Sequence, residues 1–90
     1  MGTVGVKLKI MPESVETDLE SIKLNGKEKI EQQKGVLTSF EEEPIAFGLK
    51  ALIATFAWPE EQDTDIIENM FNEIKGVSSV QIIDYRRALG

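Results

Sequence analysis

Apolar and polar residues alternate without interruption along residues 3–11. The apolar residues occupy one phase of this alternation: Val4, Val6, Leu8 and Ile10. Because successive side chains on a strand point to opposite faces of a sheet, the pattern predicts a strand with one buried and one open face. Lys7 and Lys9 fall on the open face, and Pro12 is expected to end the strand.

A helix is predicted to begin near Asp18. Thr17 and Glu20 have the spacing of a capping box, in which each side chain accepts a hydrogen bond from an otherwise unpaired backbone amide. Gly26 costs on the order of 1 kcal/mol relative to alanine inside a helix, so a break near it is an alternative to one continuous helix. Gly35 is expected to cap the helix. The predicted buried stripe is Leu19, Ile22, Gly26 and Ile30.

Two strands are predicted next. Residues 36–43 mix apolar and polar positions, as at the edge of a sheet, and Pro44 suits an edge or a strand end because it has no amide hydrogen. Residues 45–58 are apolar on both phases, which is typical of an inner strand packed on both faces. This interpretation places Phe47 inside the second of the two strands.

The last third of the chain predicts a helix and a strand. Residues 59–63 form a polar turn, after which Asp63 or Thr64 can cap a helix. Lys75 and Gly76 suit its C-terminal end, and residues 80–85 form the last strand. The apolar face of this helix is Ile66, Ile67, Met70, Phe71 and Ile74.

This order of elements predicts the fold class. Strand, helix, strand, strand, helix and strand make the α+β ferredoxin-like βαββαβ sandwich, a four-stranded antiparallel sheet with two helices on one face. Right-handed crossovers then place the first and third strands in the middle of the sheet. We expect residues 1–90 to form a single domain, because a chain this short has one core.

Composition excludes several function classes. A formal net charge of −6 and a pI near 4.6 argue against a sequence-independent nucleic-acid binder, which needs surplus cations to neutralise phosphates. The chain contains no cysteine and no histidine, so neither a thiolate zinc site nor a histidine-based catalytic set can be built from it. No window reaches the ~20 apolar residues of a membrane span, and we expect a cytoplasmic protein.

Three stretches are candidate sites. Glu41, Glu42 and Glu43 offer oxygen ligands to a hard cation, but adjacent strand residues point to opposite faces, so we expect a solvated strand end and no metal site. Arg86 and Arg87 are either a solvated terminus or a fork for carboxylate or phosphate.

The third stretch comprises residues 47–50. Phe47 is either a core residue or an exposed contact, and core is the usual state for a strand phenylalanine. Gly48 within a strand indicates a bulge or a close backbone approach. Lys50 is either a lysine extended over the open face of the sheet or a contact to an anionic group.

Several motifs in these stretches resemble one family. "EEEPIAFGLKAL" at residues 41–52, "KIMPES" after the first strand, "DLE" and "TD" at the helix starts, "KGVSSV" and "DYRR" all have the order seen in archaeal elongation factor 1-beta. The resemblance implies a ferredoxin-like exchange factor that promotes replacement of GDP by GTP on the GTPase elongation factor 1-alpha. It further implies no chemical step, no cofactor and a monomer that works alone.

The resemblance also implies contact residues. An aromatic residue of the family that touches the GTPase matches Phe47, with Gly48 and Lys50 in the same motif. A C-terminal lysine found in eukaryotic members has no match in the ending Arg86-Arg87-Ala-Leu-Gly, so we expect Arg86 or Arg87 to supply the positive charge. From the residues alone a second function stays open: a regulatory domain that binds a metabolite on a sheet face carrying Lys7 and Lys9.

Overall fold

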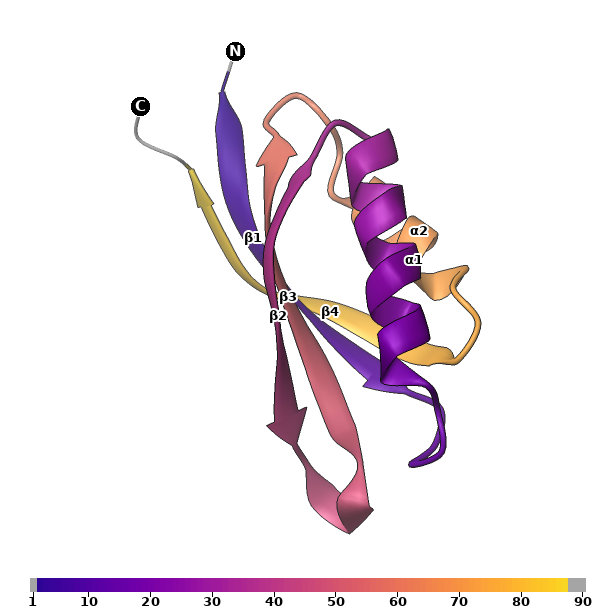
Figure 1. Cartoon of the computed structure of the whole chain (residues 1–90). Helices are drawn as coiled ribbons and strands as arrows, with labels where there is room; N and C mark the ends of the chain where they lie inside the picture. Colours follow the sequence, from indigo (N-terminus) through magenta and orange to yellow (C-terminus); the bar gives the residue numbers. More distant parts are fainter. Residues whose placement is uncertain (1, 88–90) are drawn as a thin grey trace.

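A four-stranded antiparallel sheet carries both helices on one of its faces (Figure 1). The computed structural model describes residues 2–87, and its strand order is β2-β3-β1-β4. This arrangement confirms the predicted ferredoxin-like fold, with the first and third strands in the middle. The elements are β1 (Thr3–Pro12), α1 (Leu19–Gln32), β2 (Val36–Pro44), the short 3-10 turn η1 (Ala46–Gly48), β3 (Lys50–Pro59), α2 (Asp65–Asn72) and β4 (Val77–Arg87).

The core lies between the sheet and the two helices. The alternating residues of β1 are buried as predicted, and β3 contributes Leu52, Ala54, Phe56 and Trp58 from the same face. Phe56 is the centre of an aromatic cluster: its ring lies edge-on to Trp58 at 6.1 Å and stacks with Phe71 of α2 at 6.4 Å. The indole N–H of Trp58 donates to the carbonyl of Gln62 at 3.3 Å. Among residues 2–87 no charged or polar side chain is buried in this core.

The start of α1 differs from the predicted capping box by one residue. Asp18 is the N-cap, and its Oδ1 accepts from the amides of Glu20 and Ser21 at 3.1 and 3.3 Å. Thr17 is not available for this role because its hydroxyl accepts from the amide of Ser14 in the preceding turn, at 3.1 Å. The box predicted on Thr17 was therefore wrong.

Gly26 does not break α1. The helix is continuous, and Gly26 lies buried where α1 packs on α2. A Cβ atom at this position would lie 2.8 Å from Cε2 of Phe71, so the glycine permits the close approach of the two helices. Packing against the aromatic cluster offsets the low helix propensity of this residue.

The C-terminal ends of both helices differ from prediction. After α1 the left-handed residue is Lys34, with φ 67°, whereas Gly35 is needed because a Cβ atom there would lie 2.9 Å from the carbonyl oxygen of Ala57. Helix α2 ends at Asn72, before Lys75, and Gly76 (φ 95°) turns the chain into β4 instead of capping the helix.

Of the two residues predicted to cap the start of α2, one has a side chain that makes a capping hydrogen bond. Asp63 Oδ1 accepts from the amide of Asp65 at 2.9 Å, while the side chain of Thr64 makes no capping hydrogen bond. Strand β4 is longer than residues 80–85 and contains an irregularity opposite Lys7 and Leu8 of β1. Within residues 2–87, neither helix has the length and apolarity that a membrane crossing requires.

Candidate functional site

The β2–β3 hairpin projects from one end of the sheet (Figure 1). The predicted strand over residues 45–58 was wrong in its first part, because β3 begins at Lys50 and the preceding residues form the turn. Phe47 and Gly48 are the two central residues of this turn, which closes with a hydrogen bond from the amide of Leu49 to the carbonyl of Ala46 at 3.3 Å. Neither of them lies in a strand, so the bulge predicted at Gly48 was also wrong.

The turn has the backbone of type I′. Phe47 has φ 62° and ψ 30°, and Gly48 has φ 76°. Glycine adopts this left-handed conformation freely, and asparagine is the usual residue at the first position. A phenylalanine there is strained by about 1–3 kcal/mol, and its side chain is 94% exposed. The core interpretation of Phe47 was wrong, and this side chain contributes nothing visible to the fold.

A network of ion pairs links the base of this hairpin to α1. Lys23 Nζ lies 2.8 Å from Glu20 Oε2 and 3.2 Å from Glu42 Oε2, so it links the helix to β2. Lys50 Nζ lies 3.8 Å from Glu42 Oε1. Of the two roles predicted for Lys50, the structure gives it an anionic neighbour within the chain itself. Contacts with Glu20, and then with Glu42, raise the pKa of Lys23.

We predict a small, pH-dependent effect of Glu42→Gln. The raised pKa means that the Lys23 contacts stabilise the fold while the lysine is protonated and are lost as the pH rises through its folded pKa. Chemical denaturation should show a loss below about 1 kcal/mol near neutral pH, shrinking in the alkaline range above the ordinary lysine pKa of about 10.4. Glu43→Gln, which removes the same charge from the next strand position, is the control. A difference between the two variants that is constant across this pH range would contradict the assignment.

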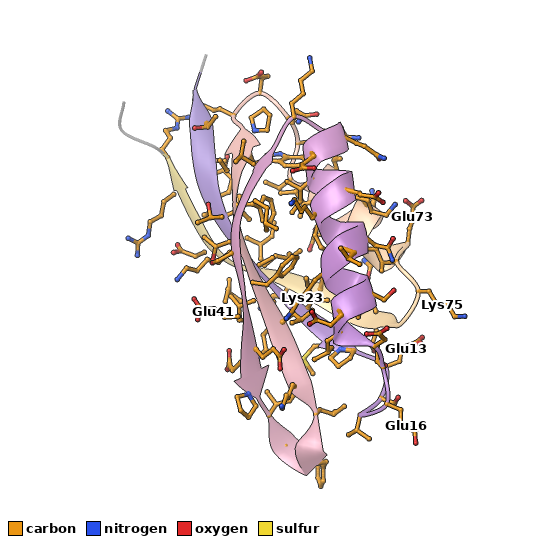
Figure 2. The ribbon with its side chains drawn as sticks, in the orientation of Figure 1. Glu13, Glu16, Lys23, Glu41, Glu73 and Lys75 are labelled. Atoms are coloured by element: carbon orange, nitrogen blue, oxygen red, sulfur yellow. The ribbon has the colours of Figure 1, made fainter. Side chains whose placement is uncertain are left out.

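The three glutamates occupy the C-terminal end of edge strand β2. Glu41, Glu42 and Glu43 are all exposed, and Figure 2 shows Glu41 directed away from the helices. Charges on an exposed edge oppose pairing with another strand. Within residues 2–87 no group of three or more acidic, histidine or cysteine side chains could hold a metal ion.

Arg86 and Arg87 lie at the other end of the molecule, at the end of β4. Each has a carboxylate neighbour: Arg86 Nε is 3.2 Å from Asp84 Oδ2, and Arg87 Nη2 is 3.0 Å from Glu60 Oε1. Residues 88–90, which include no lysine, lie outside the described part of the chain.

The structure does not bring the two predicted groups together. Arg87 pairs with Val4 at the start of β1. Ile10, near the other end of β1, pairs with Leu52 of β3, and the Phe47 turn lies past that end of the sheet. At about 3.3 Å per strand residue, the groups are roughly 30 Å apart. The chain therefore presents two separate candidate contacts, one at each end of the sheet.

Comparison with known proteins identifies the family to which this chain belongs. A sequence model described as "EF-1 guanine nucleotide exchange domain" matches residues 5–88. The chain belongs to this family. Its role is guanine nucleotide exchange in translation elongation, and the exchange domain accounts for nearly the whole chain.

Archaeal relatives support the same assignment along their full length. "Elongation factor 1-beta" of Methanosarcina mazei is 47% identical over 88 residues, covering 97% of this chain and 99% of the relative. The proteins of that name from Methanothermobacter thermautotrophicus and Metallosphaera sedula are 39% and 38% identical, with at least 97% of both chains covered. The resemblance based on "EEEPIAFGLKAL" is thus confirmed.

A solved structure with the same fold comes from outside the family. The C-terminal domain of the MgtC protein from Mycobacterium tuberculosis superposes with a TM-score of 0.71, covering 97% of this chain and 89% of that chain. The sequences are 10% identical. This likeness shows the fold alone, since the ferredoxin-like arrangement hosts unrelated functions.

One residue beside the hairpin turn carries little signal in the sequence pattern. The loop between β1 and α1 brings Val15 close to Gly48: a Cβ atom on the glycine would lie 3.7 Å from Val15 Cγ1. The available signal was slight, a single valine between Ser14 and Glu16 in a stretch without periodicity. Whether Val15 has a neighbour in the fold depends on the position of the hairpin, which the local sequence does not define.

Proposed function

We propose that this exchange domain promotes the replacement of GDP by GTP on elongation factor 1-alpha, and that Phe47 is its principal contact with that GTPase. The observation that carries the proposal is the phenylalanine itself, 94% exposed at a projecting turn and held in a left-handed backbone conformation. Strain and apolar exposure both cost stability, and residues of this kind cluster at functional sites. Glu42, Lys23 and Lys50 hold the hairpin base from which the contact projects.

The proposed mechanism is catalysis of dissociation, with no covalent step and no cofactor. A GTPase holds GDP through its phosphate-binding loop and a magnesium ion. If the exchange domain binds the nucleotide-free GTPase more tightly than the GDP complex, linkage requires that it weaken GDP binding by the same factor. GTP then binds and displaces the domain. The cytoplasmic location and the monomeric state stay predictions.

Arg86 and Arg87 are proposed as a second, cationic contact. Both side chains are exposed at the end of β4, and their carboxylate neighbours lie within this chain, so an anionic site on a partner would compete with Asp84 and Glu60. Exposed ion pairs of this kind contribute about 0–1 kcal/mol, so each arginine can leave its carboxylate within the chain for an anionic group of the partner at a small cost in free energy. A GTPase that touched both ends would have to extend along the sheet for roughly 30 Å.

The arginine contact predicts that an Arg86→Ala, Arg87→Ala double variant accelerates GDP release about threefold to tenfold less than the wild type, because charge-assisted contacts are worth about 1 kcal/mol or more. The control is Lys27→Ala, Lys75→Ala, which removes two exposed lysines and changes net charge equally. Equal rates for the arginine variant and the wild type would exclude the contact. Equal losses in both variants would reduce it to general charge steering.

The function as a whole is tested by nucleotide release. Elongation factor 1-alpha is loaded with a fluorescent GDP analogue, and the loss of its signal is followed after addition of excess GTP and substoichiometric exchange domain. Release should accelerate with the concentration of the domain, and each molecule should act many times. No acceleration at catalytic concentrations would overturn the proposal. Rises in melting temperature with small metabolites would then favour the regulatory alternative.

A further inference from the structure

The end of the molecule that carries Phe47 has a second exposed apolar side chain. Val15, in the loop between β1 and α1, is 63% exposed. A Cβ atom on Gly48 would be 3.7 Å from its Cγ1 atom, which is ordinary van der Waals contact distance, so Val15 lies beside the turn that carries Phe47. An exposed apolar side chain of a second loop therefore lies next to the turn that carries the exposed Phe47, and exposed apolar groups that gather in one place often mark a contact site.

The loop that presents Val15 is ordered by its own hydrogen bonds. Ser14 and Thr17 bond reciprocally: the amide of Ser14 donates to Thr17 Oγ1 at 3.1 Å, and the amide of Thr17 donates to the carbonyl of Ser14 at 3.2 Å. The amide of Glu16 donates to Ser14 Oγ at 3.2 Å. Val15 therefore sits at a fixed position, and docking against it requires little loss of backbone entropy.

A hollow of ≈ 210 Å³ lies between this loop and the hairpin. Polar and apolar residues both line it: Pro12, Ser14, Val15, Thr17 and Leu19 from the end of β1 to the start of α1, and Glu42, Gly48 and Lys50 from the hairpin. Figure 2 shows this loop, with Glu16 at its outer side, at the same end of the molecule as the hairpin turn. A partner that covers Phe47 would reach this hollow next, because Gly48 is the residue after Phe47 and borders it directly.

We infer that Val15 and Phe47 form one contact surface, and that Val15 docks against an apolar patch of the same GTPase. This inference rests on the proposed function. Its occupant follows from adjacency: Val15 lies beside Gly48, the residue after Phe47, so a partner that covers Phe47 comes within reach of Val15. Gly48 has a left-handed backbone and no side chain, so it places no side-chain atoms of its own beside Val15.

The two residues are expected to have different kinetic signatures. Val15 lies beside the turn and is less exposed than Phe47, 63% against 94%. We assign it a supporting contact, made equally with the GDP-bound and the nucleotide-free GTPase. Removal of such uniform binding raises the concentration of exchange domain that gives half-maximal release and leaves the maximal rate unchanged. Because Val15 is already partly covered in the free protein, we expect a change of about fivefold.

The experiment compares Val15→Ser with Val36→Ser. Val36, at the start of β2, is 64% exposed and so matches Val15 in residue type and exposure, but it lies at the opposite end of the hairpin. GDP-analogue release from elongation factor 1-alpha is measured over a range of domain concentrations for both variants, for Val15→Ile and for the wild type. Melting temperatures and Trp58 fluorescence verify that each variant is folded.

The inference predicts a half-maximal concentration about fivefold higher for Val15→Ser alone, with Val15→Ile and Val36→Ser within twofold of the wild type. A wild-type value for Val15→Ser would overturn it while leaving the exchange function intact. An equal rise in Val36→Ser would also overturn it, because the effect would then not be local. Absence of exchange by the wild-type domain would instead reject the proposed function.

Discussion

Phe47→Asn should slow GDP release tenfold or more while leaving the melting temperature unchanged or higher. Phe47 is 94% exposed in the free domain, so a partner that covers its ring gains most of the transfer free energy of a phenylalanine, about 1.5–3 kcal/mol. A factor of ten in rate corresponds to about 1.4 kcal/mol. The measurement is the GDP-analogue release assay with elongation factor 1-alpha.

The stability half of this prediction follows from the backbone. Asparagine followed by glycine is the favoured pair for a type I′ turn, and Phe47 occupies the position of the asparagine. The substitution relieves left-handed strain of about 1 kcal/mol, which corresponds to roughly 4–8 °C in a domain of this size. A variant that is more stable and less active separates the contact from the fold. A slower but destabilised Phe47→Asn, or a stable one with full activity, would contradict the assignment.

The overall fold was predictable because its signals are local and repeated. The alternation in β1 gives four core positions, and the doubly apolar residues of β3 indicate an inner strand. Each of these two hydrophobic patterns still predicts the right element when the boundary of the strand shifts by a few residues. Strand order then follows from the handedness of crossovers, which requires no information about individual side chains.

The hairpin turn was not predictable from the same signals. Apolar residues continue through Ile45 and Leu49, so periodicity extends the strand across the turn. Type I′ turns are usually marked by Asn-Gly or Asp-Gly, and here Phe47 replaces that marker. The position where local preference fails is the one proposed to contact the partner, as expected where function is retained at a cost in stability.

The geometry of the candidate site was also beyond sequence reasoning. Phe47 and Arg86 were candidates from the residues alone, and the family resemblance favoured Phe47 as a contact. Their separation at opposite ends of the sheet depends on the strand register, including the irregularity of β4 opposite Lys7. Lys50 illustrates the same limit, because its neighbour Glu42 lies eight positions earlier on the paired strand. Register determines which charges neutralise each other and which remain for a partner.

Phe56→Ala should produce the largest loss of stability, about 3–5 kcal/mol, because Phe56 is almost fully buried between Trp58 and Phe71 and its removal leaves a cavity. The melting temperature should fall by roughly 15–30 °C. Below its own melting temperature the variant should still exchange nucleotide at a rate close to the wild type, because the turn of Phe47 is held by its own hydrogen bond and by Glu42.

Phe47→Ala is the matched control, since the same atoms are removed from an exposed site. Thermal unfolding and GDP release should therefore give opposite results for the two variants: Phe56→Ala loses stability and retains exchange, and Phe47→Ala retains stability and loses exchange. If Phe56→Ala were folded but inactive, the prediction would be wrong. The position of the hairpin would then depend on the packing of the aromatic core against α2. If Phe47→Ala unfolded the domain, the assignment of Phe47 as an exposed contact would be wrong. Its ring would then have to pack against the fold in solution, in contradiction to its exposed position at the turn.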